Sequence, residues 1–365
     1  MKQKRLLCIV SSLDAGGAET YMMKIFRKLP PPYKIDFVVS TEHGYYEDEV
    51  RTLGGEIYRV PLRRKHPFKT FFAIKNVVKN NHYQAVLKLC DTPVGVFDLI
   101  AAKAGGATGL CVRSCNSASS ENALKHVFYS ALRPILNSTA SVKFAPSRLA
   151  AEYTFGKSEV TSGKVEFLNN ALDLNCFRFS EMDRNRIRNE FQIADTQMVI
   201  GHVGRFNQQK NHAFLLDVFK SYNSKNPNSV LLLVGKGELE DTIREKAKAL
   251  DISEKIIFTG VRSDVPALLS AMDVFVFPSL YEGMPNTVIE AQATGLQCVI
   301  ADTITREADI TGLVHYLPLG NAKEWASYID RLPQIARKTP IQQFKENCYD
   351  IETVADQFVK LVFRE

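Results

Sequence analysis

Two glutamates eight positions apart, Glu282 and Glu290, are the side chains of this sequence whose type and spacing most directly suggest a binding site. They lie on either side of a helix start, because Pro285 and Asn286 suit the first helical positions and Gly295 suits the residue after the end. Free backbone amides at a helix N-terminus favour a phosphate, and carboxylates accept hydrogen bonds from sugar hydroxyls. The run YEGMPNTVIEAQATG therefore fits a nucleoside diphosphate joined to a polyol. The alternative is that both acids only stabilise the helix dipole.

Two cations follow a predicted strand near the middle of the chain. The strand MVIGHVG, from Met198, leads into GRFNQQKN, where Gly204 permits a turn before Arg205 and Lys210. Such a loop at the end of a parallel strand lies where these sheets bind ligands. A guanidinium can grip one phosphate bidentately while an ammonium supplies a point charge to another. A diphosphate is the matching ligand, and the alternative is an ordinary basic surface loop.

Glycines follow two other predicted strands. The strand LLCIVSSL runs into DAGGAET, where Gly16 and Gly17 allow a backbone to approach a ligand closely and Glu19 opens a helix. This turn is either a phosphate cradle or a plain tight connection. The run GKGEL, at residues 235–239, resembles half of a dinucleotide fingerprint but lacks its third glycine, so it gives little support to NAD binding.

Short apolar segments alternate with helical segments along the whole chain, which predicts an α/β fold of parallel sheets wrapped by helices. Predicted strands begin at Leu6, Lys34, Ile57, Ala85, Leu110, Val142 and Lys164 in the first half, and at Met198, Val230, Lys255, Val274 and Cys298 in the second. We therefore expect two Rossmann-like domains, residues 1–175 and 176–345, with the change between them near residues 169–180. A last segment, 346–365, should form a helix around 351–363 that packs back onto the first domain.

Length and composition agree with two domains. The chain has 365 residues, and 45% hydrophobic against 24% charged residues is typical of a soluble globular protein. Seven cysteines without CxxC spacing indicate neither a disulfide framework nor a zinc site, which favours a reducing, cytoplasmic compartment. The start MKQKRLLCIV meets glycines without a cleavage pattern and is expected to be a buried strand. No stretch reaches the roughly 18 to 20 apolar residues of a membrane span.

Positive charge is concentrated in the first half. Residues 1–180 hold 25 Lys and Arg against 15 Asp and Glu, which suggests an anionic partner for this half. Its densest basic cluster, RRKHPFKTFF at residues 63–72, combines cations with aromatic residues and would suit an acidic membrane surface. The alternative is a solvated loop before an ordinary amphipathic helix. No nucleic-acid-binding motif accompanies the cluster, so we expect no nucleic-acid partner.

Taken together, these motifs resemble one family. The ordered set GGAE, GR with a lysine five residues on, LLLVGKGEL, FTGVRSDVPALLSAMDVFVFPS and YEGMPNTVIEAQATG is similar to the retaining glycosyltransferases of family 4, which have the GT-B fold. The resemblance covers nearly the whole chain and is densest over residues 199–302. The tail ITREADITGLVHYLPL further resembles the branch that builds bacterial capsular and extracellular polysaccharides.

The resemblance implies a nucleotide-sugar site in the cleft between the two domains. Arg205 and Lys210 would hold the donor diphosphate, Glu282 would position the donor sugar and, with these cations, act in catalysis. Glu290 would bind the ribose, and the loop 260–262 would contact the base. The implied donor-binding residues are Gly16, Gly17, Arg205, Lys210, Val261, Arg262, Glu282, Gly283, Met284, Pro285, Asn286 and Glu290.

The acceptor side departs from the family pattern. The strand from Leu110 ends in RSCNSAS, where this branch often has a histidine that contacts the transferred sugar. Asp91, Arg113 and Asn116 are then the candidate acceptor contacts, with loop capping as the alternative for each. Nothing local suggests a lowered pKa for Cys115, so it is not expected to be a nucleophile.

The implied activity is retaining transfer of a hexose or N-acetylhexosamine from a nucleotide-diphosphate sugar, preferably a UDP-sugar. The acceptor would be lipid-linked or an oligosaccharide, in cell-surface polysaccharide biosynthesis. The enzyme would need neither cofactor nor metal, in agreement with the absence of an Asp-x-Asp motif. It would act in the cytoplasm, with peripheral membrane contact as one option. Alternatives are a catalytically silent sugar-nucleotide-binding partner subunit, or a nucleotide-sugar epimerase or phosphorylase of the same fold. A Rossmann dehydrogenase is disfavoured because no complete glycine fingerprint occurs.

Overall fold

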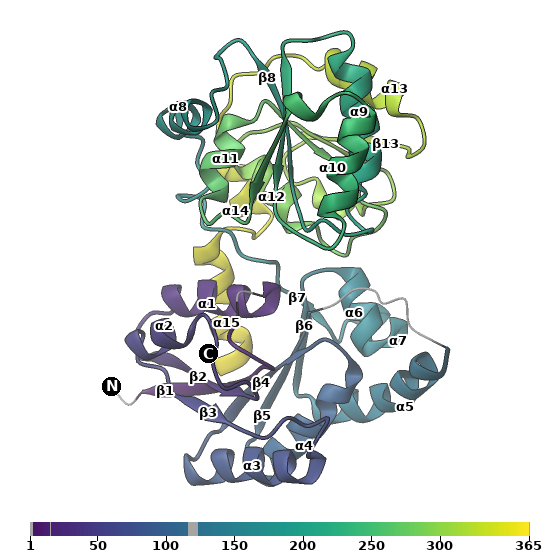
Figure 1. Cartoon of the computed structure of the whole chain (residues 1–365). Helices are drawn as coiled ribbons and strands as arrows, with labels where there is room; N and C mark the ends of the chain where they lie inside the picture. The colour runs from purple at the N-terminus through teal and green to yellow at the C-terminus, as the bar shows by residue number, and fades with distance from the viewer. Residues whose placement is uncertain (1–2, 15, 116–122, 365) are drawn as a thin grey trace. The chain divides into compact units, whose positions relative to one another are not determined.

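The computed structural model describes residues 3–14, 16–115 and 123–364 (Figure 1), and side chains from residue 127 in the helix that follows the second gap. Backbone contacts divide the chain into two units, Met1–Leu172 with Cys348–Glu365, and Asp173–Asn347. The sequence predicted that the first domain ends at residue 175 and that the returning segment begins at 346. In the structure the first unit ends at residue 172 and resumes at 348. The reason is local pairing: the amide of Leu172 donates to the carbonyl of Tyr349 (2.8 Å), and the amide of Ile351 donates back to Leu172 (3.0 Å).

The first unit is built on a parallel sheet of seven strands in the order β3-β2-β1-β4-β5-β6-β7. The strands are β1 (Lys4–Ile9), β2 (Tyr33–Val39), β3 (Ile57–Arg59), β4 (Ala85–Cys90), β5 (Gly109–Ser114), β6 (Val142–Ala145) and β7 (Glu166–Phe167). All seven strands predicted for this half are present. Its helices are α1 (Gly17–Lys28), α2 (Glu47–Thr52), α3 (Pro67–Asn80), η1 (Pro93–Gly95), α4 (Val96–Ala104), α5 (Ala123–Thr139), α6 (Arg148–Phe155), α7 (Lys157–Thr161) and α15 (Ile351–Phe363).

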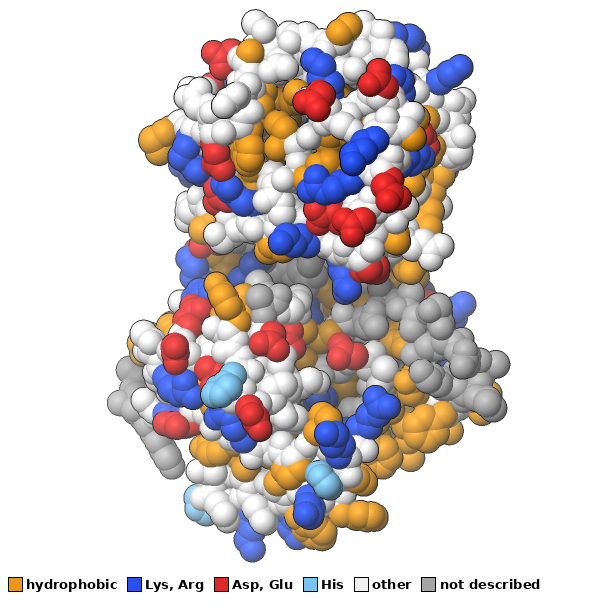
Figure 2. Space-filling view, in the orientation of Figure 1, with side chains coloured by type: hydrophobic (Ala, Val, Ile, Leu, Met, Phe, Trp, Pro, Cys, Tyr) orange, Lys and Arg blue, Asp and Glu red, His pale blue; other side chains and the backbone are white. Residues whose placement is uncertain are grey.

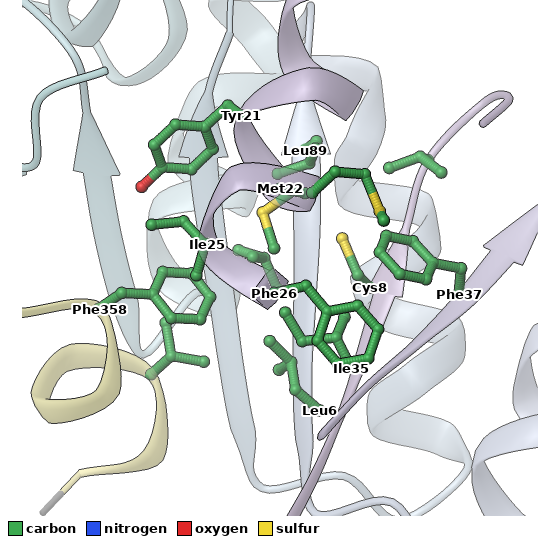
Figure 3. Close-up of a cluster of buried hydrophobic side chains, with 14 of the residues drawn as sticks. Leu6, Cys8, Tyr21, Met22, Ile25, Phe26, Ile35, Phe37, Leu89 and Phe358 are labelled. Atoms are coloured by element: carbon green, nitrogen blue, oxygen red, sulfur yellow. The ribbon is translucent and has the colours of Figure 1, made fainter. Parts of the chain in front are cut away.

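The two faces of this sheet carry separate cores. On one face, α1 and the C-terminal α15 cover the strands, and Figure 3 shows Phe26 of α1 and Phe358 of α15 in the same cluster as Leu6 and Phe37. Both Phe358 and its neighbour Val354 are fully buried there. The expected return of the last helix to the first domain is therefore observed, and this helix supplies part of the core.

The opposite face is covered by α3, α4, α5 and α6. Their inward residues form a second core with the sheet, represented by Ile74 of α3, Leu99 of α4, Leu136 of α5 and Ala151 of α6. In the part of the chain that the structure describes, none of the helices combines the length and the apolar character that a membrane span requires.

The second unit is built on a parallel sheet of six strands in the order β10-β9-β8-β11-β12-β13. The strands are β8 (Met198–Val203), β9 (Ser229–Val234), β10 (Ile256–Gly260), β11 (Val274–Phe277), β12 (Cys298–Ala301) and β13 (Val314–Leu317). Its helices are α8 (Glu181–Glu190), α9 (His212–Asn223), α10 (Glu240–Ala249), η2 (Ser253–Lys255), α11 (Val265–Ala271), α12 (Asn286–Ala293), η3 (Arg306–Ala308), α13 (Ala322–Asp330) and α14 (Ile341–Glu346). Each unit is thus a domain with a parallel sheet wrapped by helices, and the two Rossmann-like domains expected from the sequence are present.

The edge strand β13 is absent from the sequence prediction. Its four residues, VHYL, are buried at the two ends and half-buried in the middle, and they lack the long apolar run of the central strands, such as the fully buried SVLLLV of β9. Central strands of a parallel sheet are covered on both faces and therefore read as continuous apolar segments, whereas an edge strand gives a weaker signal.

Three arginines bind the carboxyl end of α11, the helix that leads into β11. The guanidinium of Arg337 donates to the carbonyls of Leu269 (3.1 Å) and Met272 (2.8 Å), and burial lowers its pKa to about 9. Arg184 and Arg188 donate to neighbouring carbonyls of the same helix end and also pair with Asp273. Cations at a helix C-terminus satisfy free carbonyls and oppose the negative end of the dipole.

Candidate functional site

The loop after β8 rests on a second glycine-rich loop, after β9. The amide of Gly204 donates to the carbonyl of Val234 (2.9 Å), and the amide of Phe206 donates to the carbonyl of Lys236 (3.1 Å). A side chain at Gly235 or Gly237 would collide with the backbone of residues 204–206, and Gly235 also has a φ of +133°. The GKG run is therefore glycine-rich because two backbones touch, and its role is to support the loop that carries Arg205.

Lys210 and Glu282 form an ion pair at the carboxyl end of the second sheet. The Lys210 ammonium lies 2.6 Å from Oε1 of Glu282 and 4.7 Å from the ring centre of Phe277. The side chains are 17% and 9% exposed, so both charges are partly withdrawn from water. The structure thus brings together two residues that lie 72 positions apart and that the sequence assigns to one site.

Arg205 lies at the edge of this group. Its side chain is 71% exposed and its guanidinium is 3.2 Å from a carboxylate oxygen of Glu238, itself 57% exposed. A solvent-exposed pair of this kind contributes little to stability, so the guanidinium is available to an incoming anion. The three predicted catalytic side chains are therefore a partly buried ion pair, Lys210 with Glu282, and an exposed cation, Arg205.

Helix α12 starts as expected, directly after the loop that holds Glu282. Pro285 occupies the N-cap and offers no side chain to the amides of the first turn, and Gly295 follows the helix end with a φ of +69°. Glu290 lies one turn into the helix and is half-buried. The loop before the helix is hydrogen-bonded to the loop after β8 that carries Arg205 and Lys210, here called the cationic loop. The amide of Leu280 donates to the carbonyl of Gln209, and the Gln209 side chain donates to the carbonyl of Tyr281, both at 2.8 Å.

Two buried histidines lie behind the cationic loop, and the sequence prediction overlooked them. The rings of His202 and His212 are 4.6 Å apart, and His212 stacks on Phe206 at 4.1 Å. Both are almost fully buried, at 0% and 2% exposure. Nε2 of His202 and both ring nitrogens of His212 have no hydrogen-bond partner among the described residues.

Burial keeps both histidines neutral. It lowers the pKa of His212 to about 4, with a further lowering by the Lys210 cation, and it lowers the pKa of His202 well below the usual range. A series of ring contacts, stacked between Phe206 and His212, edge-on between His212 and His202, and stacked between His202 and Phe277, connects the start of the loop to the ring over which the Lys210 ammonium lies. The signal for this pair was the histidine inside the apolar strand IGHV together with the histidine that follows KN.

The loop predicted to contact the base has its arginine already engaged. The Arg262 guanidinium binds Glu190 at 2.6 Å and Asp264 at 2.8 Å, and it holds the pKa of Asp264 at about 2. Val261 beside it is 74% exposed. A base contact through the Arg262 side chain is therefore not favoured by this arrangement, whereas the exposed Val261 and the adjoining backbone remain accessible.

The glycine turn of the first unit lies after β1, at the start of α1. Gly16 is the N-cap, and Gly17 begins the helix. A side chain at Gly17 would meet nothing within 4 Å, so packing does not explain this glycine. Burial raises the pKa of the nearby Glu19, and the carboxylates of Asp91 and Asp14 raise it further, which places three acids near the ends of β1 and β4.

The candidate acceptor residues have different positions in the structure. Asp91 is exposed at the end of β4. Arg113, in contrast, is only 2% exposed: its guanidinium lies 3.7 Å from the ring centre of Tyr21 and donates to Asn170. This burial contradicts a direct acceptor contact by Arg113. Asn116 lies outside the described residues. Burial raises the pKa of the Cys115 thiol, in agreement with its exclusion as a nucleophile.

Comparison with known proteins identifies relatives along the whole chain. The family described as "Glycosyl transferases group 1" matches residues 183–334. The putative glycosyltransferase EpsF of Bacillus subtilis (strain 168) is 32% identical over 347 residues, which are 92% of this chain and 89% of EpsF. The capsular polysaccharide biosynthesis glycosyltransferase CapH of Staphylococcus aureus is 22% identical over 98% of each chain.

A lipid-linked acceptor appears in the name of another relative. The N-acetylgalactosamine-N,N'-diacetylbacillosaminyl-diphospho-undecaprenol 4-alpha-N-acetylgalactosaminyltransferase of Campylobacter jejuni is 21% identical, over 82% of this chain and 81% of its own length. Among solved structures, Anabaena Alr3699/HepE in complex with UDP and glucose superposes with a TM-score of 0.78 at 18% identity, covering 100% of both chains.

Proposed function

Because this chain belongs to the group 1 glycosyl transferases and has their GT-B fold, we propose that it transfers a hexose or N-acetylhexosamine, with retention, from a UDP-sugar to a lipid-linked or oligosaccharide acceptor. Relatives named for capsular polysaccharide support a place in polysaccharide biosynthesis. The UDP of the HepE complex supports the choice of nucleotide, and the undecaprenol diphosphate in the name of the Campylobacter relative supports a lipid-linked acceptor.

The observation that carries the proposal is the partly buried Lys210–Glu282 pair beside the N-terminus of α12, with the exposed Arg205 at its rim. A diphosphate entering this site would compete with Glu282 for the Lys210 ammonium. The released carboxylate could then accept hydrogen bonds from donor-sugar hydroxyls, while Arg205 exchanges Glu238 for a phosphate oxygen. Glu290, half-buried one turn into the helix, would take the ribose hydroxyls.

The proposed reaction uses this charge arrangement. The bond between the anomeric carbon and the diphosphate oxygen breaks, and the acceptor oxygen bonds to the same face of that carbon. The acceptor's hydroxyl proton passes to the departing phosphate oxygen. Catalysis then consists of stabilising the negative charge that grows on the diphosphate, a task for Lys210, Arg205 and the α12 amides. A cofactor and a metal ion are not required in this scheme.

Arg205→Ala tests the catalytic assignment. Because the arginine would stabilise the leaving diphosphate, we expect turnover to fall roughly 10²- to 10³-fold in a donor-sugar transfer assay, by analogy with the loss of one oxyanion donor. Arg244→Ala is the matched control, since Arg244 is an exposed arginine of the same unit that pairs with Glu240 at 2.7 Å. Near-normal turnover of a folded Arg205→Ala protein would contradict the assignment.

A panel of sugar nucleotides, assayed by thermal shift with and without a chelator, tests the donor class. We expect a UDP-sugar to raise the melting temperature equally in both conditions. Two alternatives have distinct signatures in the same purified protein. Isomerisation of free donor would indicate an epimerase, and donor binding without any hydrolysis or transfer would indicate a silent partner subunit. We infer that the enzyme acts in the cytoplasm on an acceptor held at the membrane.

A further inference from the structure

The loop between β2 and α2 presents an exposed aromatic ring. Tyr45 is 74% exposed, whereas the next residue, Tyr46, is only 8% exposed. Their ring centres are 5.0 Å apart, and the rings meet edge-on at 83°. The Tyr46 hydroxyl lies 2.9 Å from the hydroxyl of Thr20 in α1, which holds the buried ring in place. An exposed tyrosine supported in this way offers a large contact area at a low cost in conformational entropy.

The same loop is fixed to the glycine turn that follows β1. The amide of Tyr46 donates to the carbonyl of Leu13 (2.9 Å). A side chain at Gly44 would approach the backbone of Leu13 to 2.9 Å, so the two loops touch and a larger residue has no room there. Tyr45 therefore lies in a loop at the carboxyl end of the first sheet, beside the glycine turn. Ligands of open parallel sheets bind at this end.

An open cavity of about 600 Å³ adjoins the loop, between α2 and β3. Its polar lining consists of the side chains of Glu42, His43, Glu47, Asp48, Arg51 and Arg59. Glu47 is the buried member, at 6% exposure, and it binds Arg51 at 3.0 Å and Arg59 at 2.6 Å. The two arginine side chains are themselves 51% and 42% exposed, so the buried carboxylate fixes two hydrogen-bond donors at the surface of the cavity.

Both signs of charge occur in this cavity. Arg51 and Arg59 line it together with the exposed Glu42 and Asp48. Figure 2 shows red and blue side chains close together over α2. The acids would repel a phosphate or a carboxylate, which disfavours an anionic sugar and a nucleic acid as ligands. A neutral polyol suits the lining, because each of its hydroxyls both donates and accepts hydrogen bonds.

We propose that Tyr45 and the cavity beside it bind a neutral sugar of the acceptor; this rests on the proposed function, in which the acceptor carries a saccharide. The C–H face of a pyranose packs on the face of Tyr45, whose π electrons attract the C–H hydrogens. Its hydroxyls bind the guanidinium groups of Arg51 and Arg59 and the carboxylate of Glu42. The enzyme thereby selects an acceptor by its sugar as well as by any lipid joined to it.

Saturation-transfer NMR of the full chain with cellobiose, without donor or lipid, tests this site. Cellobiose is a suitable probe because the hydroxyls of its non-reducing ring are equatorial, so that C–H groups form both faces of that ring. We expect transfer from the protein to these C–H protons, and a titration should show at least about tenfold weaker binding by Tyr45→Ala. Tyr45→Phe keeps the ring face and should retain the binding. Sorbitol, a polyol without a ring, should receive no transfer.

Phe68→Ala is the matched control, because Phe68 is 79% exposed in the same unit but belongs to α3. It should leave cellobiose binding unchanged. Equal loss in this control, equal transfer to sorbitol, or loss of binding in Tyr45→Phe would overturn the inference.

A UDP-induced rise in melting temperature, measured on every variant, separates this inference from the proposed function. Absence of the rise in the parent would contradict the nucleotide-sugar proposal. A normal rise would confine the failure to the sugar site if cellobiose received no transfer, or if Tyr45→Ala bound it as well as the parent does.

Discussion

At the residue scale, the two buried histidines, His202 and His212, make the loop after β8 sensitive to acid. A histidine that cannot be protonated in the folded state still binds a proton when the chain unfolds, with an ordinary pKa of about 6.5. For His212 the folded pKa of about 4 is lower, so the unfolded state binds more protons between these values. Stability is therefore unaffected above about pH 6.5 and is lost as the pH falls towards 4.

His212→Phe should reduce this acid sensitivity. Phenylalanine keeps the ring stack and loses no hydrogen bond, because neither His212 nitrogen has a partner among the described residues. Between pH 7.5 and pH 5, one such site costs about 2 kcal/mol of unfolding free energy. We expect the variant to lose that much less than the parent in urea titrations followed by Trp325, the single tryptophan, which lies in the second unit. An identical pH dependence in both proteins would contradict the assigned pKa.

At the element scale, the carboxyl end of α11 depends on a distant loop. Arg337 belongs to no helix or strand, yet it satisfies carbonyls of α11 and of Thr294 from 43 to 68 positions away. Arg337→Met would leave several buried carbonyls without a donor, and each such loss costs about 1 to 3 kcal/mol. We therefore expect the second unit to lose on the order of 3 kcal/mol, measured by urea unfolding with Trp325 fluorescence.

Arg331→Met provides the comparison for this prediction. Arg331 is exposed, lies six positions earlier and donates to a single carbonyl, that of Ser327, at 3.1 Å. Its replacement should change the unfolding free energy by less than about 0.5 kcal/mol. Similar effects of the two substitutions would mean that Arg337 does not hold the helix end.

Elements were predicted from the sequence more completely than side-chain partners were. Twelve strands and the start of α12 were recovered, because apolar runs and the Pro285–Asn286 pair are local signals. The roles of Arg262 and Arg113 could not be recovered. Arg262 binds Glu190, 72 positions away, and Arg113 is buried under Tyr21, so only the folded chain shows that these cations are already occupied. The resemblance assigned Lys210 and Glu282 to one donor site, but the ion pair between them was not predicted, because no spacing rule gives it.

At the scale of the whole molecule, the first unit is completed only by the last segment of the chain. Phe358 is fully buried against the strands of the first sheet, so Phe358→Ala should cost that unit about 3 to 5 kcal/mol. The expected signature is a shift of the circular-dichroism transition to lower urea, while the Trp325 fluorescence transition stays in place. Lys360→Ala, at an exposed position of the same helix, should shift neither transition. Loss of both transitions together would mean that the units unfold as one.

The hydrogen bond between Leu172 and Tyr349 lies where the chain leaves the first unit and where it returns, so it bears on how the second unit could be exchanged during evolution. Because the second unit departs and returns at points joined by a 2.8 Å hydrogen bond, it is an insertion whose two ends coincide. Exchanging everything between them for the corresponding part of a relative would remove no core residue from the first sheet. The second unit, which is proposed to select the sugar nucleotide, can therefore be exchanged as a whole. The core of the first unit, which is proposed to bind the acceptor, would stay unchanged.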